Sequence, residues 1–211
     1  MMDKPVDHQK IKWKMKLDYS HAQADKLNKG LDGLQSLILL LGKPNVGLHD
    51  FLQQAANFLA KQFRLRSVTI GLRSSDGKYR YEVMTGLREE AWSFQKSLAY
   101  SREDFSETTE VYKGEMISKL TKLFLIEDSP FPDDEKDAFN RPYVLGMRRR
   151  TVDDWVEGDY LDTHIMGSDG SLIGWIEIVG TVDGKLPDVT VIKWLETISA
   201  LLTVRIEMKK H

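Results

Sequence analysis

Apolar residues recur at intervals of three and four positions in two early stretches of the sequence. The first stretch begins at about Gln23, and its spacing predicts a helix with one apolar stripe. Gly42 and Pro44 end this helix, because glycine suits a helix C-terminus and proline cannot continue the helix. The second stretch predicts another amphipathic helix. The apolar positions are Leu27, Leu31, Leu34, Ile38 and Leu41 in the first helix, and Leu48, Phe51, Leu52, Ala55, Phe58, Leu59 and Phe63 in the second.

Four other stretches are rich in β-branched residues or alternate between apolar and polar positions, as strands do. Residues 67–72 and 79–86 flank an Asp-Gly turn, and this arrangement predicts a hairpin. Residues 160–166 and 172–179 flank a second Asp-Gly turn. Two hairpins of this kind predict an antiparallel sheet.

The rest of the chain divides into a closing helix and a less regular middle. Apolar spacing predicts a helix over residues 189–209 and a shorter one over residues 89–98. Residues 101–142 lose this periodicity, accumulate charge and contain three prolines, which is typical of a functional lid or a variable segment. A short strand is predicted over residues 143–149, and the acidic residues 133–135 suit the N-terminus of a helix.

Residues 1–22 form a separate basic and apolar arm in this interpretation. From Lys10 to Leu17 basic and apolar residues alternate strictly, which places the lysines on one face of an extended segment. We expect the arm to dock on its own domain or on a second copy of the chain, with an acidic partner or a membrane surface as the alternative. Residues 23–211 then form a single domain, since 211 residues suffice for one core with appendages.

Composition narrows the possible functions. Apolar residues make up 41% and charged residues 29%, as in ordinary folded proteins. The net charge of −2 provides no positive field for a phosphate backbone, so nucleic acid is not an expected partner. The first residues lack the apolar core of a signal peptide, and the densest apolar run, residues 37–41, is too short to span a bilayer. We therefore expect no membrane insertion and a cytoplasmic location.

The chain contains no cysteine, which removes disulfides, thiolate metal sites and cysteine nucleophiles. The five histidines show no pair at the spacing of helical metal ligands, and the acidic run at residues 133–137 lacks the pattern of an EF-hand. We expect no metal. The sequence shows no glycine-rich phosphate loop and no hydrolase motif, and it does not identify a cofactor.

The segment from residue 158 to residue 207 combines a strand, a turn, a second strand and a helix. The second strand contains Leu172-Ile173-Gly174-Trp175-Ile176, and Asp183-Gly184-Lys185-Leu186-Pro187 precedes the helix. These residues resemble the GAF domain family, in particular its stand-alone bacterial and archaeal sensors, and the likeness extends over residues 23–209.

The resemblance implies an α+β fold of the GAF/PAS-like kind, with a central antiparallel sheet of about five or six strands. The N- and C-terminal helices would pack on one face of this sheet. Residues 101–142 would cover the other face and enclose a ligand cavity. GAF-like photosensors attach a bilin through cysteine, so the resemblance does not imply a covalent bilin in this chain.

Strand alternation places residues 160, 162, 164 and 166 on one face of their strand, and Leu161, Thr163 and Ile165 on the other. The first face would line a GAF-like cavity, although a half-exposed strand face has the same pattern. Arg148 begins a run of three arginines that suits an anion or, more simply, surface pairing with nearby acids. The candidate ligand-binding residues are Tyr160, Asp162, His164, Met166, Trp175, Tyr112 and Arg148.

The resulting hypothesis is a non-catalytic regulatory module that senses a small molecule and relays a signal through the terminal helices of a homodimer. The apolar surface of these helices exceeds what one sheet face can cover, which favours the dimer. A signalling protein such as a histidine kinase is the expected partner. Two alternatives stay open: a protein-interaction subunit whose cavity is filled, and a small hydrolase-type enzyme that uses Asp159, Asp162 and His164.

Overall fold

The computed structural model describes residues 26–106, 112–128, 133–145 and 147–208. The strands are β1 (Leu65–Arg73), β2 (Tyr79–Thr85), β3 (Glu115–Met116), β4 (Thr121–Phe124), β5 (Tyr160–Met166) and β6 (Leu172–Thr181). They form one antiparallel six-stranded sheet in the order β2-β1-β6-β5-β4-β3. The arm of residues 1–22 lies outside the described residues, so the division of the chain at residue 22 stays a prediction.

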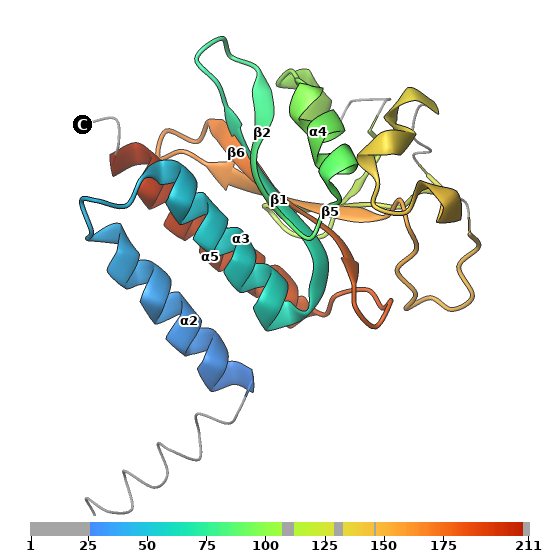
Figure 1. Ribbon diagram of the computed structural model, residues 1–211, viewed down its shortest axis with the longest axis horizontal. Coiled ribbons are helices and arrows are strands. Elements are labelled where there is room, and N and C mark those ends of the chain that lie inside the picture. The colour runs from blue at the N-terminus through green and yellow to red at the C-terminus, as the bar shows by residue number, and fades with distance from the viewer. Residues whose placement is uncertain (1–25, 107–111, 129–132, 146, 209–211) are drawn as a thin grey trace, which may run out of the picture.

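Long helices cover one face of the sheet, and shorter helical segments lie over the other (Figure 1). The long ones are α2 (Lys26–Leu41), α3 (Leu48–Phe63) and α5 (Val189–Met208); the shorter ones are α4 (Glu89–Ser97) and the 3-10 helices η1 (Glu103–Phe105), η2 (Asp133–Ala138) and η3 (Pro142–Val144). Helix α3 packs on β1 and β2, α5 packs on β5, and α2 lies outside them against α3. The predicted fold class is therefore confirmed, with the N- and C-terminal helices on one face.

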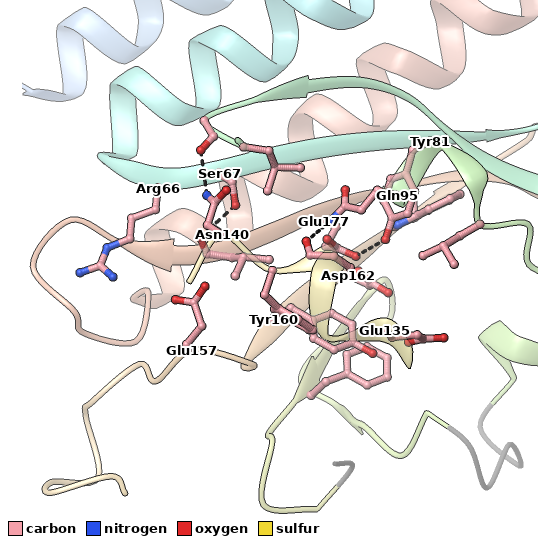
Figure 2. A pocket seen from close by; sticks show the side chains of 18 of the residues that line it. Arg66, Ser67, Tyr81, Gln95, Glu135, Asn140, Glu157, Tyr160, Asp162 and Glu177 are labelled. Atoms are coloured by element: carbon pink, nitrogen blue, oxygen red, sulfur yellow. Dashed lines mark hydrogen bonds between the residues drawn. The ribbon is translucent and has the colours of Figure 1, made fainter. Parts of the chain in front are cut away.

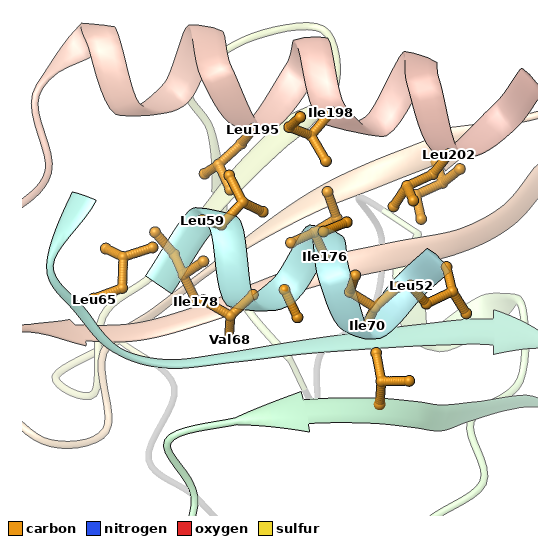
Figure 3. Packing of buried hydrophobic residues seen from close by; sticks show 14 of the residues in the cluster. Leu52, Leu59, Leu65, Val68, Ile70, Ile176, Ile178, Leu195, Ile198 and Leu202 are labelled. Carbon is orange, nitrogen blue, oxygen red and sulfur yellow. The ribbon is translucent and has the colours of Figure 1, made fainter. Parts of the chain in front are cut away.

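The main hydrophobic core lies between the sheet and the long helices (Figure 3). Ile176 and Ile178 of β6 point into it and are fully buried. Leu195 and Ile198 of α5 meet them from the other side and are also fully buried. Burial of an aliphatic side chain of this size stabilises a fold by roughly 1.5–3 kcal/mol. This face of the sheet therefore contributes most of the apolar packing.

Side-chain hydrogen bonds also join helix α5 to strand β5. Ser199 Oγ donates to the carbonyl of His164 at 2.7 Å, and Thr203 Oγ1 donates to the carbonyl of Met166 at 2.8 Å. The two hydroxyl groups are about one helical turn apart, and the two carbonyls are two residues apart on the strand. The hydrogen bonds therefore fix the position of the helix along the strand.

Helix α2 is the outermost layer of the helical face. It approaches α3 closely because Gly33 has no side chain: a Cβ there would lie 2.2 Å from a ring carbon of Phe58. Leu37 is buried against α3, whereas Leu31 and Ile38 are each 50% exposed. An apolar strip of α2 is thus left uncovered by the described residues.

The middle of the chain departs from the sequence prediction. Residues 143–149 do not form the expected strand, because Pro142 has the fixed φ of a first helical position and starts the 3-10 helix η3. Strands β3 and β4 were missed, since two and four residues are too few to show a period. The acidic residues 133–135 do begin a helical segment, η2.

Candidate functional site

A cavity of about 490 Å³ lies on the face of the sheet opposite the long helices. Residues of β1, β5 and β6 form its floor, and residues of α4, η1 and η2 help to cover it. It therefore lies between the sheet and the segment of residues 101–142, together with α4. A cavity of this volume suits a small organic molecule.

Glu177 of β6 is a central polar group of the cavity floor. The residue is 8% exposed, and Thr69 Oγ1 and Tyr81 Oη donate to its two carboxyl oxygens at 3.3 and 2.7 Å. Figure 2 shows Tyr81 and Glu177 on the same side of the cavity. Burial raises the pKa of Glu177 to about 7, although the two hydroxyl donors act against the rise.

Asp162 of β5 lies directly opposite Glu177 in the strand register. The residue is 6% exposed, and its Oδ1 has no hydrogen-bond partner in the described part of the chain. Burial and the adjacent Glu177 raise the pKa of Asp162 well above its ordinary value, whereas Lys122 lowers it. Lys122, on β4, is buried, and its ammonium donates to the carbonyls of Ser106 and Tyr112 at 3.2 and 3.4 Å. Two carboxyl groups thus lie on the cavity floor beside a buried ammonium.

Gln95 of helix α4 adds an acceptor to the cavity wall. Its Nε2 donates to the carbonyl of Ala138 at 3.2 Å, which ties α4 to η2. Its Oε1 is buried and has no hydrogen-bond partner among the described residues. The residue is 5% exposed, so bulk solvent does not replace the partner that this oxygen lacks among the described residues.

Aromatic side chains surround the same part of the cavity. The centroid of the Trp175 indole lies 5.0 Å from that of Tyr81, 5.1 Å from that of Phe105 and 5.9 Å from that of Tyr100. The indole lies over Gly71 of β1, where a Cβ would come within 2.0 Å of the ring. Glycine at this position therefore allows the largest aromatic side chain to lie against the sheet.

The opposite end of the cavity is basic. Arg66, Arg88 and Arg141 line it, and Figure 2 shows Arg66 and Glu157 on the side away from Asp162 and Glu177. Arg141 donates to Glu157 Oε2 through Nε at 2.9 Å and Nη2 at 2.7 Å. This pairing neutralises part of the charge at the basic end.

The sequence-predicted candidates divide into two groups. Tyr160, Asp162, Trp175 and Tyr112 line the cavity. His164, Met166 and Arg148 are not among its lining residues: His164 lies against the Phe105 ring at 6.2 Å, Met166 packs on a small cluster with Trp175, and Arg148 is exposed. Burial lowers the pKa of His164, and Lys122 adds to this effect. A ligand-binding role for all seven residues stays a prediction.

Asp159 belongs to a separate buried ion pair. Arg149 Nη2 contacts its two carboxyl oxygens at 2.8 and 3.0 Å, and the backbone N–H groups of Ile126 and Val156 donate to it at 3.2 and 3.0 Å. Asp159 does not line the cavity. The geometry therefore does not gather Asp159, Asp162 and His164 at one point of the cavity.

Sequence reasoning missed Glu177, Tyr81, Tyr100 and Gln95. The signal for Glu177 was present: it lies two residues after Trp175 on the same strand, within an otherwise apolar run. A lone carboxyl group in such a strand predicts either an exposed face or a buried polar site. Gln95 carried no comparable signal, because a glutamine on a short helix is ordinary.

The described residues show no cluster of three or more histidine, aspartate and glutamate side chains that could hold a metal ion. Across the same ranges, every helix is too short or too polar to cross a membrane. The residues that line the cavity carry carboxyl, amide, guanidinium, hydroxyl and aromatic groups.

Several solved structures superpose on the chain over most of its length. The A. aeolicus nlh2 GAF domain in an inactive state does so with a TM-score of 0.57 and 12% identity, over 88% of this chain and 99% of that one. The GAF domain of an Acinetobacter phosphoenolpyruvate-protein phosphotransferase gives a TM-score of 0.52 and 16% identity, over 85% of this chain and 94% of the Acinetobacter domain. The fold is that of a GAF domain.

A third GAF structure comes from a putative sensor histidine kinase of Pseudomonas syringae pv. tomato. The match covers 92% of this chain and 94% of the kinase GAF chain, with a TM-score of 0.51 and 13% identity. No protein-family model matches the sequence, and no curated protein does. The predicted resemblance to GAF domains is therefore confirmed at the level of the three-dimensional fold.

Proposed function

We propose that this GAF-like chain is a regulatory module of signal transduction that binds a small molecule in the cavity over Glu177. The observation that carries the proposal is a cavity whose lining residues include two buried acceptor atoms, Asp162 Oδ1 and Gln95 Oε1, without partners among the described residues. Buried polar atoms without partners are costly, so a fold keeps them where a ligand supplies the missing bonds. A GAF domain from a sensor histidine kinase among the similar structures supports a signalling role, with such a kinase as partner.

The proposed role is non-catalytic. Asp159 is engaged by Arg149 and two backbone donors, and the His164 ring is outside the cavity lining, so the hydrolase alternative lacks two of its three groups at the site. A cytoplasmic location is part of the proposal, since a chain without cysteine fits a reducing compartment. A hydrolase activity that Asp162→Asn abolishes would contradict the non-catalytic role.

A cavity-filling variant tests ligand binding. Ala138 is 8% exposed and lines the cavity, so Ala138→Phe should occupy the space that a ligand needs. Native mass spectrometry of the freshly purified protein should then detect a retained small molecule in the wild type and lose it in Ala138→Phe. The exposed Ala99 provides the matched control, since Ala99→Phe adds the same ring outside the cavity lining. If all three proteins give the same spectrum without an adduct, the result would contradict ligand binding and support the alternative of an interaction subunit.

The proposed module is a homodimer through its terminal helices. Leu31 and Ile38 of α2 are 50% exposed, Leu39 is 63% exposed, and Val204 and Met208 of α5 are 49% and 52% exposed. Such apolar strips on helices at both ends of the domain favour a helical bundle between two copies. The arm of residues 1–22 is the competing occupant of this surface.

Light scattering at micromolar concentration tests the dimer. The wild type should have twice the chain mass, and Ile38→Glu should give a monomer because it places a charge in the apolar interface. Ser36→Glu adds the same charge at an exposed polar position of the same helix and should stay dimeric. A monomeric wild type contradicts the proposal, and a chain that becomes dimeric only after removal of residues 1–22 assigns the surface to the arm.

A further inference from the structure

We propose that the cavity ligand is a protonated organic amine, whose N–H groups reach Asp162, Glu177 and Gln95 while aromatic rings surround its cationic head. This inference rests on the proposed function, because it names the chemical class of the ligand for the same cavity. Three independent properties of the cavity support it: the type of its unpartnered atoms, its charge and its rings.

The unpartnered polar atoms are acceptors. Asp162 Oδ1 and Gln95 Oε1 are both buried, and both lack a donor within the described ranges. The donors nearby are already engaged: Tyr81 Oη donates to Glu177, and Gln95 Nε2 donates to Ala138. A ligand that completes this site must therefore bring N–H or O–H groups, and an ammonium carries three N–H groups.

The charge of the floor favours a cation. Glu177 and Asp162 are register partners on adjacent strands, and like carboxyl groups at this spacing cannot both ionise without a counter-charge. The charged or titratable groups that act on the pair from neighbouring elements are Lys122, Tyr81, Tyr100, Tyr160 and Glu135, and His164 lies near Lys122. Lys122 brings one positive charge to the two carboxyl groups, so a second cation is needed to balance both of them as anions.

Near neutral pH Glu177, whose pKa is about 7, is the member of this group that changes charge. Burial raises the pKa of Tyr81, Tyr100 and Tyr160 well above their ordinary value, so these side chains stay neutral. Burial also lowers the pKa of His164. Binding of an ammonium would then replace the proton of Glu177.

The aromatic rings provide a second source of affinity for a cation. Trp175, Tyr81, Tyr100 and Phe105 all belong to one cluster with ring centroids 5.0–6.0 Å apart, and all line the cavity. The face of an aromatic ring attracts a cation, most strongly in a desolvated site. The same principle already operates next to the cavity, where Lys122 Nζ lies 5.0 Å from the Phe124 ring.

An anionic ligand fits less well. The basic end offers Arg66, Arg88 and Arg141, but Arg141 is already paired with the buried Glu157. An anion long enough to fill the cavity would also face the carboxyl pair at the other end. The two ends together favour an amine whose body extends toward the arginines and carries no second positive charge there.

Three probes of similar size test the inference by calorimetry at millimolar concentration: phenethylamine, phenethyl alcohol and phenylacetate. We expect phenethylamine to bind and the alcohol and the acid to bind at least about tenfold more weakly. The affinity for phenethylamine should rise about tenfold from about pH 5.5 to about pH 8, because protons compete with the amine for the carboxyl groups at low pH. Stronger binding of the neutral or anionic probe, or affinity that is independent of pH, overturns the inference.

Variants connect the binding to the residues. Glu177→Gln and Gln95→Leu should each weaken the binding of phenethylamine at least about tenfold, and Glu177→Gln should also reduce the pH dependence of binding. Glu82→Gln, at an exposed position of β2, removes the same charge outside the cavity and should leave binding unchanged. Gln95→Leu keeps the test valid if Glu177→Gln fails to fold. Equal binding by all variants overturns the inference.

The two proposals fail separately. If phenethylamine does not bind but native mass spectrometry finds a neutral or anionic adduct that Ala138→Phe loses, the amine is wrong and the small-molecule cavity stands. If neither an adduct nor probe binding is found, both are wrong.

Discussion

The two faces of the sheet differ in what they bury. On the helical face, β6 contributes Ile176 and Ile178 to a continuous aliphatic core with α3 and α5. On the cavity face, the alternate residues of the same strand are Trp175 and Glu177, which meet tyrosines and a second carboxyl group. One strand therefore serves both faces, because successive side chains point in opposite directions.

This difference separates the residues that stabilise the fold from those that reduce its stability. Aliphatic burial is favourable without partners, whereas burial of a carboxyl group is costly unless donors or counter-charges surround it. Asp162 lacks a donor for Oδ1 in the described structure, so the cavity face retains groups that packing alone would replace. The contrast teaches that the helical face carries the stability of the fold, whereas the cavity face carries the polar groups on which the proposed binding function rests.

The largest effect is expected from a comparison of two buried aspartates. Asp159→Ala should lower the free energy of unfolding by about 3–5 kcal/mol, because it leaves Arg149 with only the half-exposed Glu127 as an anionic partner and removes the acceptor of two backbone N–H groups. Asp162→Asn should change it by less than about 1 kcal/mol or raise it, since a neutral amide replaces a buried carboxyl group whose Oδ1 has no donor among the described residues. Urea unfolding measures both, and equal losses would erase the distinction between the two acids.

A second comparison concerns leucines on the two faces. Leu195→Ala creates a cavity in the fully buried core of the helical face and should lower the free energy of unfolding by about 2–5 kcal/mol. Leu98→Ala truncates a half-buried side chain that already borders open space, so its cost should stay below about 1.5 kcal/mol. The same urea titration distinguishes them. A larger loss for Leu98 would mean that the cavity face also supports the fold.

Stability should fall as the pH rises from 4.5 to about 7. The ordinary pKa of a glutamate is 4.5, whereas that of Glu177 in the folded chain is about 7, so the folded state binds the proton more tightly than the unfolded state. Its stabilising contribution is therefore complete below pH 4.5 and lost as the pH passes 7, for a total of about 3 kcal/mol. The pKa of Asp162 is also raised in the folded chain, so its contribution to stability changes with pH in the same direction.

Unfolding free energies at about pH 5 and about pH 8 measure this slope. Glu177→Gln should reduce the difference between the two values, whereas Glu82→Gln should keep the wild-type difference because Glu82 is exposed. A wild-type stability that increases over this interval would show that the carboxyl pair is ionised and matched by donors.

Periodicity predicted the helical face more completely than the cavity face. The positions of Leu52, Leu59, Leu195 and Ile198 follow from apolar spacing, because a helix that covers a sheet needs one continuous stripe. The alternation of residues 160–166 also predicted which side chains of β5 enter the core. These features depend on local sequence alone.

The cavity cover could not be predicted in the same way. Gln95 meets Ala138, and Lys122 meets Ser106 and Tyr112, through contacts between segments that have no shared period. The partners of the ion pairs could not be predicted from local sequence either. Arg149 pairs with Asp159 and Glu127 rather than with the acids at positions 153 and 154, which are nearer in sequence. Tertiary contacts of short segments decided these positions.

The hydroxyl groups of Ser199 and Thr203 have a mechanical consequence. Helix α5 cannot slide along β5 by one turn without breaking both hydrogen bonds to the carbonyls of His164 and Met166. A shift of the strand that carries Asp162 along its own axis would therefore either displace the closing helix or strain these two hydrogen bonds.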